Sequence, residues 1–310
     1  MLKNFVRLLC LTGLILVWGS FAKAQSQLTP GNLALLNKLQ ISLADISDST
    51  FNIENDEGKI AQNTHFVKEL VKALKTPHSY AFNFDSLKNI SILKAPNNSF
   101  KIFTWSLALS NGTYKFYGTI QLPTKDGQLK LVPLNDATSQ ISDPDAITNA
   151  KNWYGARYYE IMPVSSYNNQ PSYFILLGWK GYTNKTTQKV IEVLTLDKDE
   201  AIFGKKIFET AVNSNTLKNR VIFEYSSKNS MTLTYNRSVS MIVFDHLAPY
   251  EPSMKDQFEY YVSDSSFDGY IINYNRFKLK ENITLKNDPS VQDEHYKPPV
   301  KATTLLKKAN

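Results

Sequence analysis

The chain has 310 residues, of which 35 are Lys or Arg and 28 are Asp or Glu, with a formal charge of +7. Only five of the basic residues are Arg, and the Lys are dispersed, whereas nucleic-acid sites favour clustered basic residues and planar guanidinium groups, so no nucleic-acid partner is expected. The single Cys, Cys10, excludes an intramolecular disulfide framework and a metal centre built from several Cys.

The first 24 residues have the pattern of a secretory signal peptide. Two basic residues precede an apolar run from 8 to 21, and Ala22-Lys23-Ala24 is a small-x-small cleavage signal. We expect cleavage between Ala24 and Gln25. Because the apolar run is shorter than the ~20 residues that a membrane span needs, we expect a soluble exported chain and not an integral membrane protein.

Residues 25–76 are expected to form an N-terminal helical segment. The apolar residues of a first helix recur at spacings of three and four: Leu36, Leu39, Leu43 and Ile46. The polar stretch 45–55 is expected to end this helix. A second helix is expected from Lys59 to Lys75, with Pro77 as its stop signal.

From about Tyr80 the apolar period changes from 3.6 to 2, which predicts an antiparallel β domain over 77–286. Asn111-Gly112 and Asp126-Gly127 are expected hairpin turns between its first strands. Later strands are expected at 158–164, 173–177, 190–196, 220–225, 231–235, 241–244, 258–262 and 277–285. We expect 220–225 and 231–235 to pair with each other, and 264–269 to form a β-turn.

The strand pattern predicts a mainly β fold: an antiparallel meander forming a sandwich or an open barrel, preceded by the two helices. The 17 Tyr and 17 Phe agree with this, because aromatic residues suit pleated surfaces. A β-propeller is the minor alternative, since no repeat of ~40 residues keeps its register. Residues 287–310 are polar, contain three Pro, and are expected to be a loose tail.

Common catalytic motifs are absent from the sequence, including G-x-S-x-G, H-E-x-x-H and the Walker loop. No two of the four His have metal-ligand spacing, so we expect neither a metal nor a cofactor.

The polar pair Asp245-His246 follows the apolar strand 241–244, and a His beside a carboxylate can act as a base. The alternative is that Asp245 caps a turn and His246 packs at the sheet edge, since adjacent strand residues point to opposite faces. Glu160 or Glu224 is a candidate second carboxylate for glycoside hydrolysis, which depends on the separation of the two groups.

Large aromatic residues next to glycine are candidate ligand-binding platforms. Trp153 and Tyr154 precede Gly155, and Trp179 and Tyr182 flank Lys180-Gly181. Exposed rings of this kind can stack on sugars. The alternative is that they pack in the core or at a sheet edge.

Four segments resemble a group of exported proteins from Bacteroidota: FKIFTWSLALSNGTYKFYGTIQL (100–122), NWYGARYYEIMPV (152–164), YFILLGWKGYTNKTTQKVIEVLTL (173–196) and MIVFDHLAP (241–249). The similarity extends over about 30–285. It implies a Gram-negative envelope setting and carries no catalytic residue over to this chain. The end of the chain does not resemble a folded C-terminal secretion domain, which favours the periplasm over the cell surface.

Three functions remain open on these grounds. The first is non-catalytic binding of a glycan, a peptide or an envelope partner, which predicts an exposed aromatic or polar groove. The second is a hydrolase of an envelope or dietary polymer, which predicts that Asp245, His246 or Glu160 converge in a cleft. The third is a structural or assembly component, which predicts that Leu36, Leu39 and Leu43 form an exposed apolar stripe.

Overall fold

The computed structural model describes residues 28–50, 52–165 and 171–284. The expected signal peptide with its cleavage site at Ala24 and Gln25 and the tail 287–310 lie outside these residues. So does a turn expected at Asn168-Asn169 between the strands at 158–164 and 173–177. Within the described ranges, no helix combines the length and apolar character needed to cross a membrane.

Two helices begin the described chain, as expected: α2 (Pro30–Thr50) and α3 (Asp56–Leu74). The Asn55 side chain caps α3 by accepting a hydrogen bond from the Gly58 N–H. The expected end of α2 at 45 is wrong. The helix continues to Thr50 because Thr50 is buried and its hydroxyl donates to the Ile46 carbonyl within the helix.

Sixteen strands in the described residues form three sheets. The first sheet has the order β1 (Ser91–Lys94), β2 (Lys101–Ala108), β3 (Tyr114–Gln121), β4 (Leu131–Asn135). The second has the order β5 (Thr148–Asn149), β9 (Glu200–Phe203), β8 (Thr186–Asp197), β7 (Pro171–Gly181), β6 (Arg157–Ser165), with β12 (Val221–Ser226) also paired to β8. The third has the order β11 (Leu217–Lys218), β10 (Phe208–Glu209), β16 (Arg276–Lys280), β15 (Tyr261–Asn273), β14 (Met241–Pro249), β13 (Leu233–Asn236).

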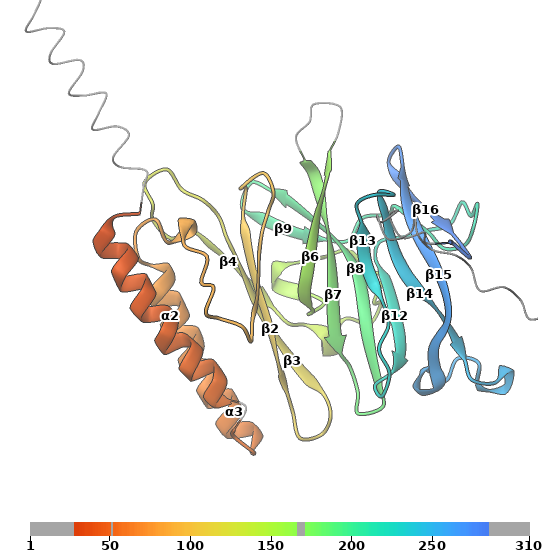
Figure 1. The fold of residues 1–310 in the computed structure, drawn as a ribbon, viewed down its shortest axis with the longest axis horizontal. Coiled ribbons are helices and arrows are strands. Elements are labelled where there is room, and N and C mark those ends of the chain that lie inside the picture. Colours follow the sequence, from red (N-terminus) through yellow and green to blue (C-terminus); the bar gives the residue numbers. More distant parts are fainter. Residues whose placement is uncertain (1–27, 51, 166–170, 285–310) are drawn as a thin grey trace, which may run out of the picture.

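The helices and the three sheets stack as successive layers, so the sandwich expected from the sequence is confirmed (Figure 1). Three apolar cores lie between the layers. Phe66 and Phe103 belong to the core between the helices and the first sheet. Alternation along β7 divides its side chains between the other two cores. Leu176 belongs to the core shared with the first sheet, and Leu177 to the core shared with the third.

The residues expected to form an exposed stripe on α2 are part of this core. Leu36 and Leu43 are completely or almost completely buried, and Leu39 is partly buried against the same cluster. These positions therefore do not form the exposed apolar stripe that an assembly component was expected to have.

The expected hairpin of 220–225 with 231–235 is wrong. β12 pairs with β8, and β13 pairs with β14. β9 pairs only with the C-terminal part of β8, which leaves the backbone groups of residues 186–191 for β12 to satisfy.

The turn expected at 264–269 is also wrong, because β15 runs through this segment. The register against β14 shifts between Asp245 and Leu247, and Ser265 has a left-handed φ of 72° opposite that shift. The chain instead reverses after Asn273, which pairs with Arg276 at the start of β16. Residues Phe258–Tyr260, expected in a strand, form a 3-10 turn.

Candidate binding groove

Two hairpin tips meet at one end of the molecule, the lower end in Figure 1. They are the β2–β3 turn at Asn111-Gly112 and the β7–β8 turn around Asn184. Gly112 has φ +80°, and a Cβ atom there would lie 2.5 Å from Cβ of Asn184. Glycine is needed at this turn both for its left-handed backbone and for the close contact between the tips.

Three adjoining depressions lie beside these tips, and together we call them the groove. The largest, about 960 Å³, lies between β3, the end of β4 and the β7–β8 turn. The second, about 260 Å³, shares Tyr114, Gly181 and Thr183 with the first. The third, about 440 Å³, is lined by β1 and β6 and shares Trp179 with the second. The three depressions therefore adjoin one another and are lined by residues of the first and second sheets.

The groove is lined by seven aromatic residues: Tyr114, Phe116, Tyr117, Tyr159, Trp179, Tyr182 and Tyr225. Phe116 and Tyr225 are buried, and the other five are at least partly exposed. The half-buried ring of Trp179 packs edge-on against Tyr114, with 5.3 Å between ring centroids. Tyr114 also lies against Gly181, where a Cβ atom would be 2.3 Å from the ring. Of the four predicted platform residues, Trp179 and Tyr182 thus reach the groove.

The other two predicted platform residues, Trp153 and Tyr154, are buried, with 0% and 4% exposure, so their expected exposure is wrong. The indole N–H of Trp153 donates to the Tyr158 hydroxyl at 3.0 Å, inside the core between the first and second sheets. The Tyr154 hydroxyl donates to the Gln188 side chain at 3.0 Å. Both aromatic residues hold the core together behind the groove instead of facing a ligand.

Lys180 is completely buried beneath the largest depression. Its ammonium donates to the Thr138 hydroxyl (2.7 Å) and to the carbonyls of Tyr154 (2.6 Å) and Gly155 (2.8 Å). Burial lowers the pKa of Lys180 to about 7, and the nearby Asp136 carboxylate opposes that shift. Three acceptors for three N–H groups favour the ammonium form, so Lys180 fixes the floor of the groove.

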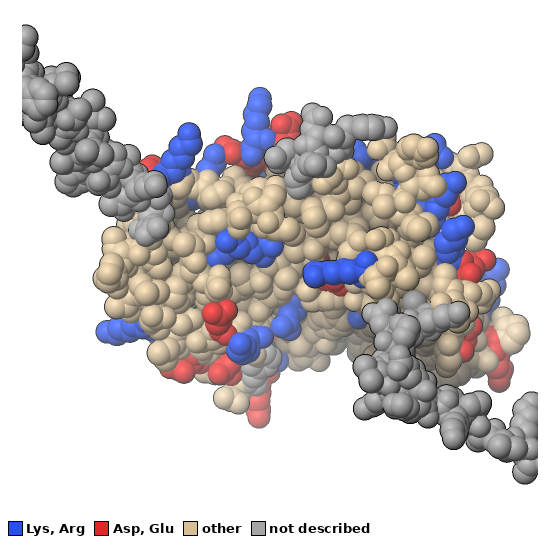
Figure 2. Space-filling model, turned by 45° about the horizontal axis from the view of Figure 1, so that its top comes forward, with Lys and Arg blue, Asp and Glu red and all other residues tan. Residues whose placement is uncertain are grey.

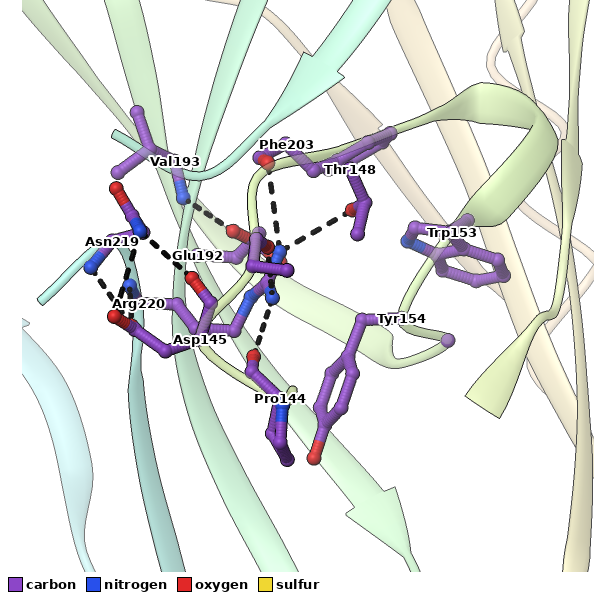
Figure 3. A network of polar contacts seen from close by, with 12 residues as sticks. Pro144, Asp145, Thr148, Trp153, Tyr154, Glu192, Val193, Phe203, Asn219 and Arg220 are labelled. Carbon is purple, nitrogen blue, oxygen red and sulfur yellow. Dashed lines mark hydrogen bonds and ion pairs between the residues drawn. The ribbon is translucent and has the colours of Figure 1, made fainter. Parts of the chain in front are cut away.

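A second buried cation, Arg220, anchors the segment that precedes Trp153 (Figure 3). Its five N–H groups donate to Glu192 (2.8 Å), the carbonyls of Pro144 (2.5 Å) and Ala146 (2.8 Å), the Thr148 hydroxyl (3.3 Å) and the Phe203 carbonyl (3.5 Å). Its guanidinium also lies 5.1 Å from the ring centroid of Tyr154. Burial raises the pKa of Glu192, and the charge and hydrogen bond of Arg220 oppose the rise.

The predicted catalytic residues do not converge. Glu160 accepts from the Tyr235 N–H (3.1 Å), and Asp245 accepts from the Thr232 N–H (2.9 Å). Neither residue nor His246 lines any of the three depressions of the groove. Glu224 accepts from the Gln188 side chain (2.9 Å).

His246 is paired, although not with its neighbour Asp245. Its Nδ1 lies 2.7 Å from a carboxylate oxygen of Asp268 on β15, and its side chain remains 45% exposed. This hydrogen bond raises the pKa of His246 above its ordinary value. Sequence reasoning missed Asp268 because it assigned residues 264–269 to a turn. Among the described residues, no group of three or more His, Cys, Asp and Glu side chains could hold a metal ion.

Comparisons with protein-family models, with curated proteins and with solved structures find no match. The functional argument therefore rests on the residues of the groove.

Proposed function

We propose that this protein is an exported binding protein of a bacterial periplasm that holds an oligosaccharide in the groove without cleaving it. The observation that carries the proposal is the set of five partly exposed aromatic rings beside hydroxyl and amide side chains in the adjoining depressions of the groove. A sugar presents an apolar ring face and a rim of hydroxyl groups, and an aromatic surface bordered by a few polar groups complements both.

Polar side chains stand where a sugar rim would meet them. Around Trp179 the second depression is lined by Thr183, Ser227, Asn229 and Ser230. Thr113 and Asn135 line the largest depression near Tyr182. These groups can donate and accept hydrogen bonds, so the groove suits a chain of several sugars more than a single apolar ligand.

Binding without cleavage is supported by the separation of the titratable groups. Hydrolysis of a glycosidic bond needs two carboxyl groups on either side of the scissile bond. Among the described residues, Asp136 is the only carboxylate that lines the groove. Its oxygens already accept from the N–H of Phe116 (2.9 Å) and the N–H of Thr138 (3.0 Å). A general acid and a nucleophile are therefore not paired there.

Calorimetric titration with a panel of oligosaccharides tests the proposal, using the protein and two substitutions. Trp179→Ala and Tyr182→Ala should each weaken binding about tenfold or more, because each removes a stacking surface. Tyr274→Ala is the matched control: Tyr274 is 90% exposed in the β15–β16 turn and should leave affinity unchanged. Mass spectrometry of the recovered oligosaccharide should find it uncut.

The proposal is wrong if no oligosaccharide binds, or if Tyr274→Ala weakens binding as much as Trp179→Ala does. Recovery of shorter products would replace it with the hydrolase interpretation.

A further inference from the structure

We infer that the ligand of the groove is anionic, an acidic oligosaccharide carrying carboxylate or sulfate groups. This inference rests on the proposed function and names the class of saccharide. It is drawn from the charged residues that line the groove and from the strand pairing that places two of them next to Trp179.

Three adjacent strands place one cationic residue on each of the two strands that flank Trp179. Arg157 on β6 pairs directly with Trp179 on β7, and Trp179 pairs directly with Lys189 on β8. Directly paired residues project to the same face of a sheet. The Cα atoms of Arg157 and Lys189 are two strand spacings apart, roughly 10 Å. A sugar stacked on Trp179 would therefore have two cationic side chains, Arg157 and Lys189, beside it.

These cations have no carboxylate partner among the described residues. No ion pair or side-chain hydrogen bond to a carboxylate is found there for Arg157, Lys189 or Lys115, the third cation of the groove. Arg157 and Lys189 are only partly exposed, so water screens them less than it screens a fully exposed lysine.

The carboxylates near these cations already accept hydrogen bonds from backbone N–H groups. Asp245 attracts Lys189 electrostatically, yet its carboxylate accepts from the Thr232 N–H. Glu160 is held by the Tyr235 N–H. Lys189 instead lies over the Tyr159 ring, 5.0 Å from its centroid. The groove thus presents three cations against the single, fully hydrogen-bonded carboxylate of Asp136.

This excess of cations belongs to the lining of the groove. Figure 2 shows Lys and Arg interspersed with Asp and Glu over the face in view, with wide areas of neither. An anionic ligand would form charge-assisted hydrogen bonds with Arg157 and Lys189 while its ring covers Trp179, which a neutral saccharide cannot do.

The test is a calorimetric comparison of an oligogalacturonide with a neutral oligosaccharide of the same length, at low and high salt. The acidic probe should bind at least about tenfold more tightly at low salt and lose affinity as salt rises. Arg157→Gln and Lys189→Gln should each weaken the acidic probe about tenfold and leave the neutral probe unchanged. Lys38→Gln removes the same charge from the exposed side of α2 and should change neither.

The outcomes separate this inference from the proposed function. Equal affinity for the two probes, both lost in Trp179→Ala, would overturn the anionic preference and leave saccharide binding in place. No binding of either probe would overturn both. Tighter binding of a single-stranded oligonucleotide than of the oligogalacturonide, abolished by the same substitutions, would overturn both and assign the groove to nucleic acid.

Discussion

Replacing Arg220 with Met should destabilise the protein more than any single change in the groove. The substitution removes five donors from a completely buried site and leaves the Glu192 carboxylate with only the Val193 N–H, at 3.0 Å. Breaking a buried ion pair by removing one partner costs about 3–5 kcal/mol, because an uncompensated charge stays buried. For a domain of this size that loss corresponds to a fall in Tm of about 6–20 °C.

The assay is thermal unfolding at pH 4 and pH 7, with Arg157→Met as the matched control. Arg157 is partly exposed and has no side-chain hydrogen bond among the described residues, so its substitution should change the free energy of unfolding by no more than about 0.5 kcal/mol. In Arg220→Met, Glu192 must take up a proton to stay buried, so its folded pKa would rise above the unfolded value of about 4.3. When the folded pKa is above the unfolded pKa, the free energy of unfolding falls as pH rises from the unfolded pKa to the folded pKa. The loss of stability in Arg220→Met, relative to the unchanged protein, should therefore be larger at pH 7 than at pH 4. The reasoning is refuted if both arginine variants unfold at similar temperatures, or if the deficit of Arg220→Met does not depend on pH.

Three further outcomes are expected. Lys180→Met should lower the free energy of unfolding in urea by about 3 kcal/mol or more, because two buried carbonyls and the partly buried Thr138 hydroxyl lose their donor; a change below about 1 kcal/mol would contradict this. Asp268 raises the pKa of His246, so their pairing stabilises the fold fully below about pH 6.5 and this is lost as pH rises through the folded pKa; Asp268→Asn should remove that part of the pH dependence, and an unchanged curve would refute the pairing. Gly181→Ala should weaken oligosaccharide binding by displacing the Tyr114 ring, whereas Gly31→Ala, where a Cβ meets nothing within 4 Å, should not.

The sequence predicts those parts of the fold that depend on neighbouring residues. Apolar periods of 3.6 and 2 locate both helices and the β2–β3 hairpin, because each of these elements is encoded within about 20 residues. The pairing of β12 with β8 was missed, since it depends on which part of β8 lacks another neighbour. Local turn signals do not show which part of β8 is left without a neighbouring strand.

The candidate site is predicted only in part, for the same reason. Trp153 and Trp179 both stand near a glycine, yet one is buried and the other lines the groove. Layers formed by distant segments decide which ring is covered. The acceptors of Arg220 include carbonyls 74 and 76 residues away, so a buried role for this residue has no local signature.

The most direct test of saccharide binding in the groove is an NMR titration that follows the indole N–H signals of the tryptophans with the oligogalacturonide. Trp105 donates its indole N–H to Asn63 (2.7 Å) and Trp153 donates to Tyr158 (3.0 Å), whereas the indole N–H of Trp179 has no partner among the described residues. We predict that the Trp179 signal, assigned from the spectrum of Trp179→Phe, shifts progressively while the signals of Trp105 and Trp153 stay in place. A shift of the Trp105 signal alone, or no shift at saturating ligand, would contradict the account.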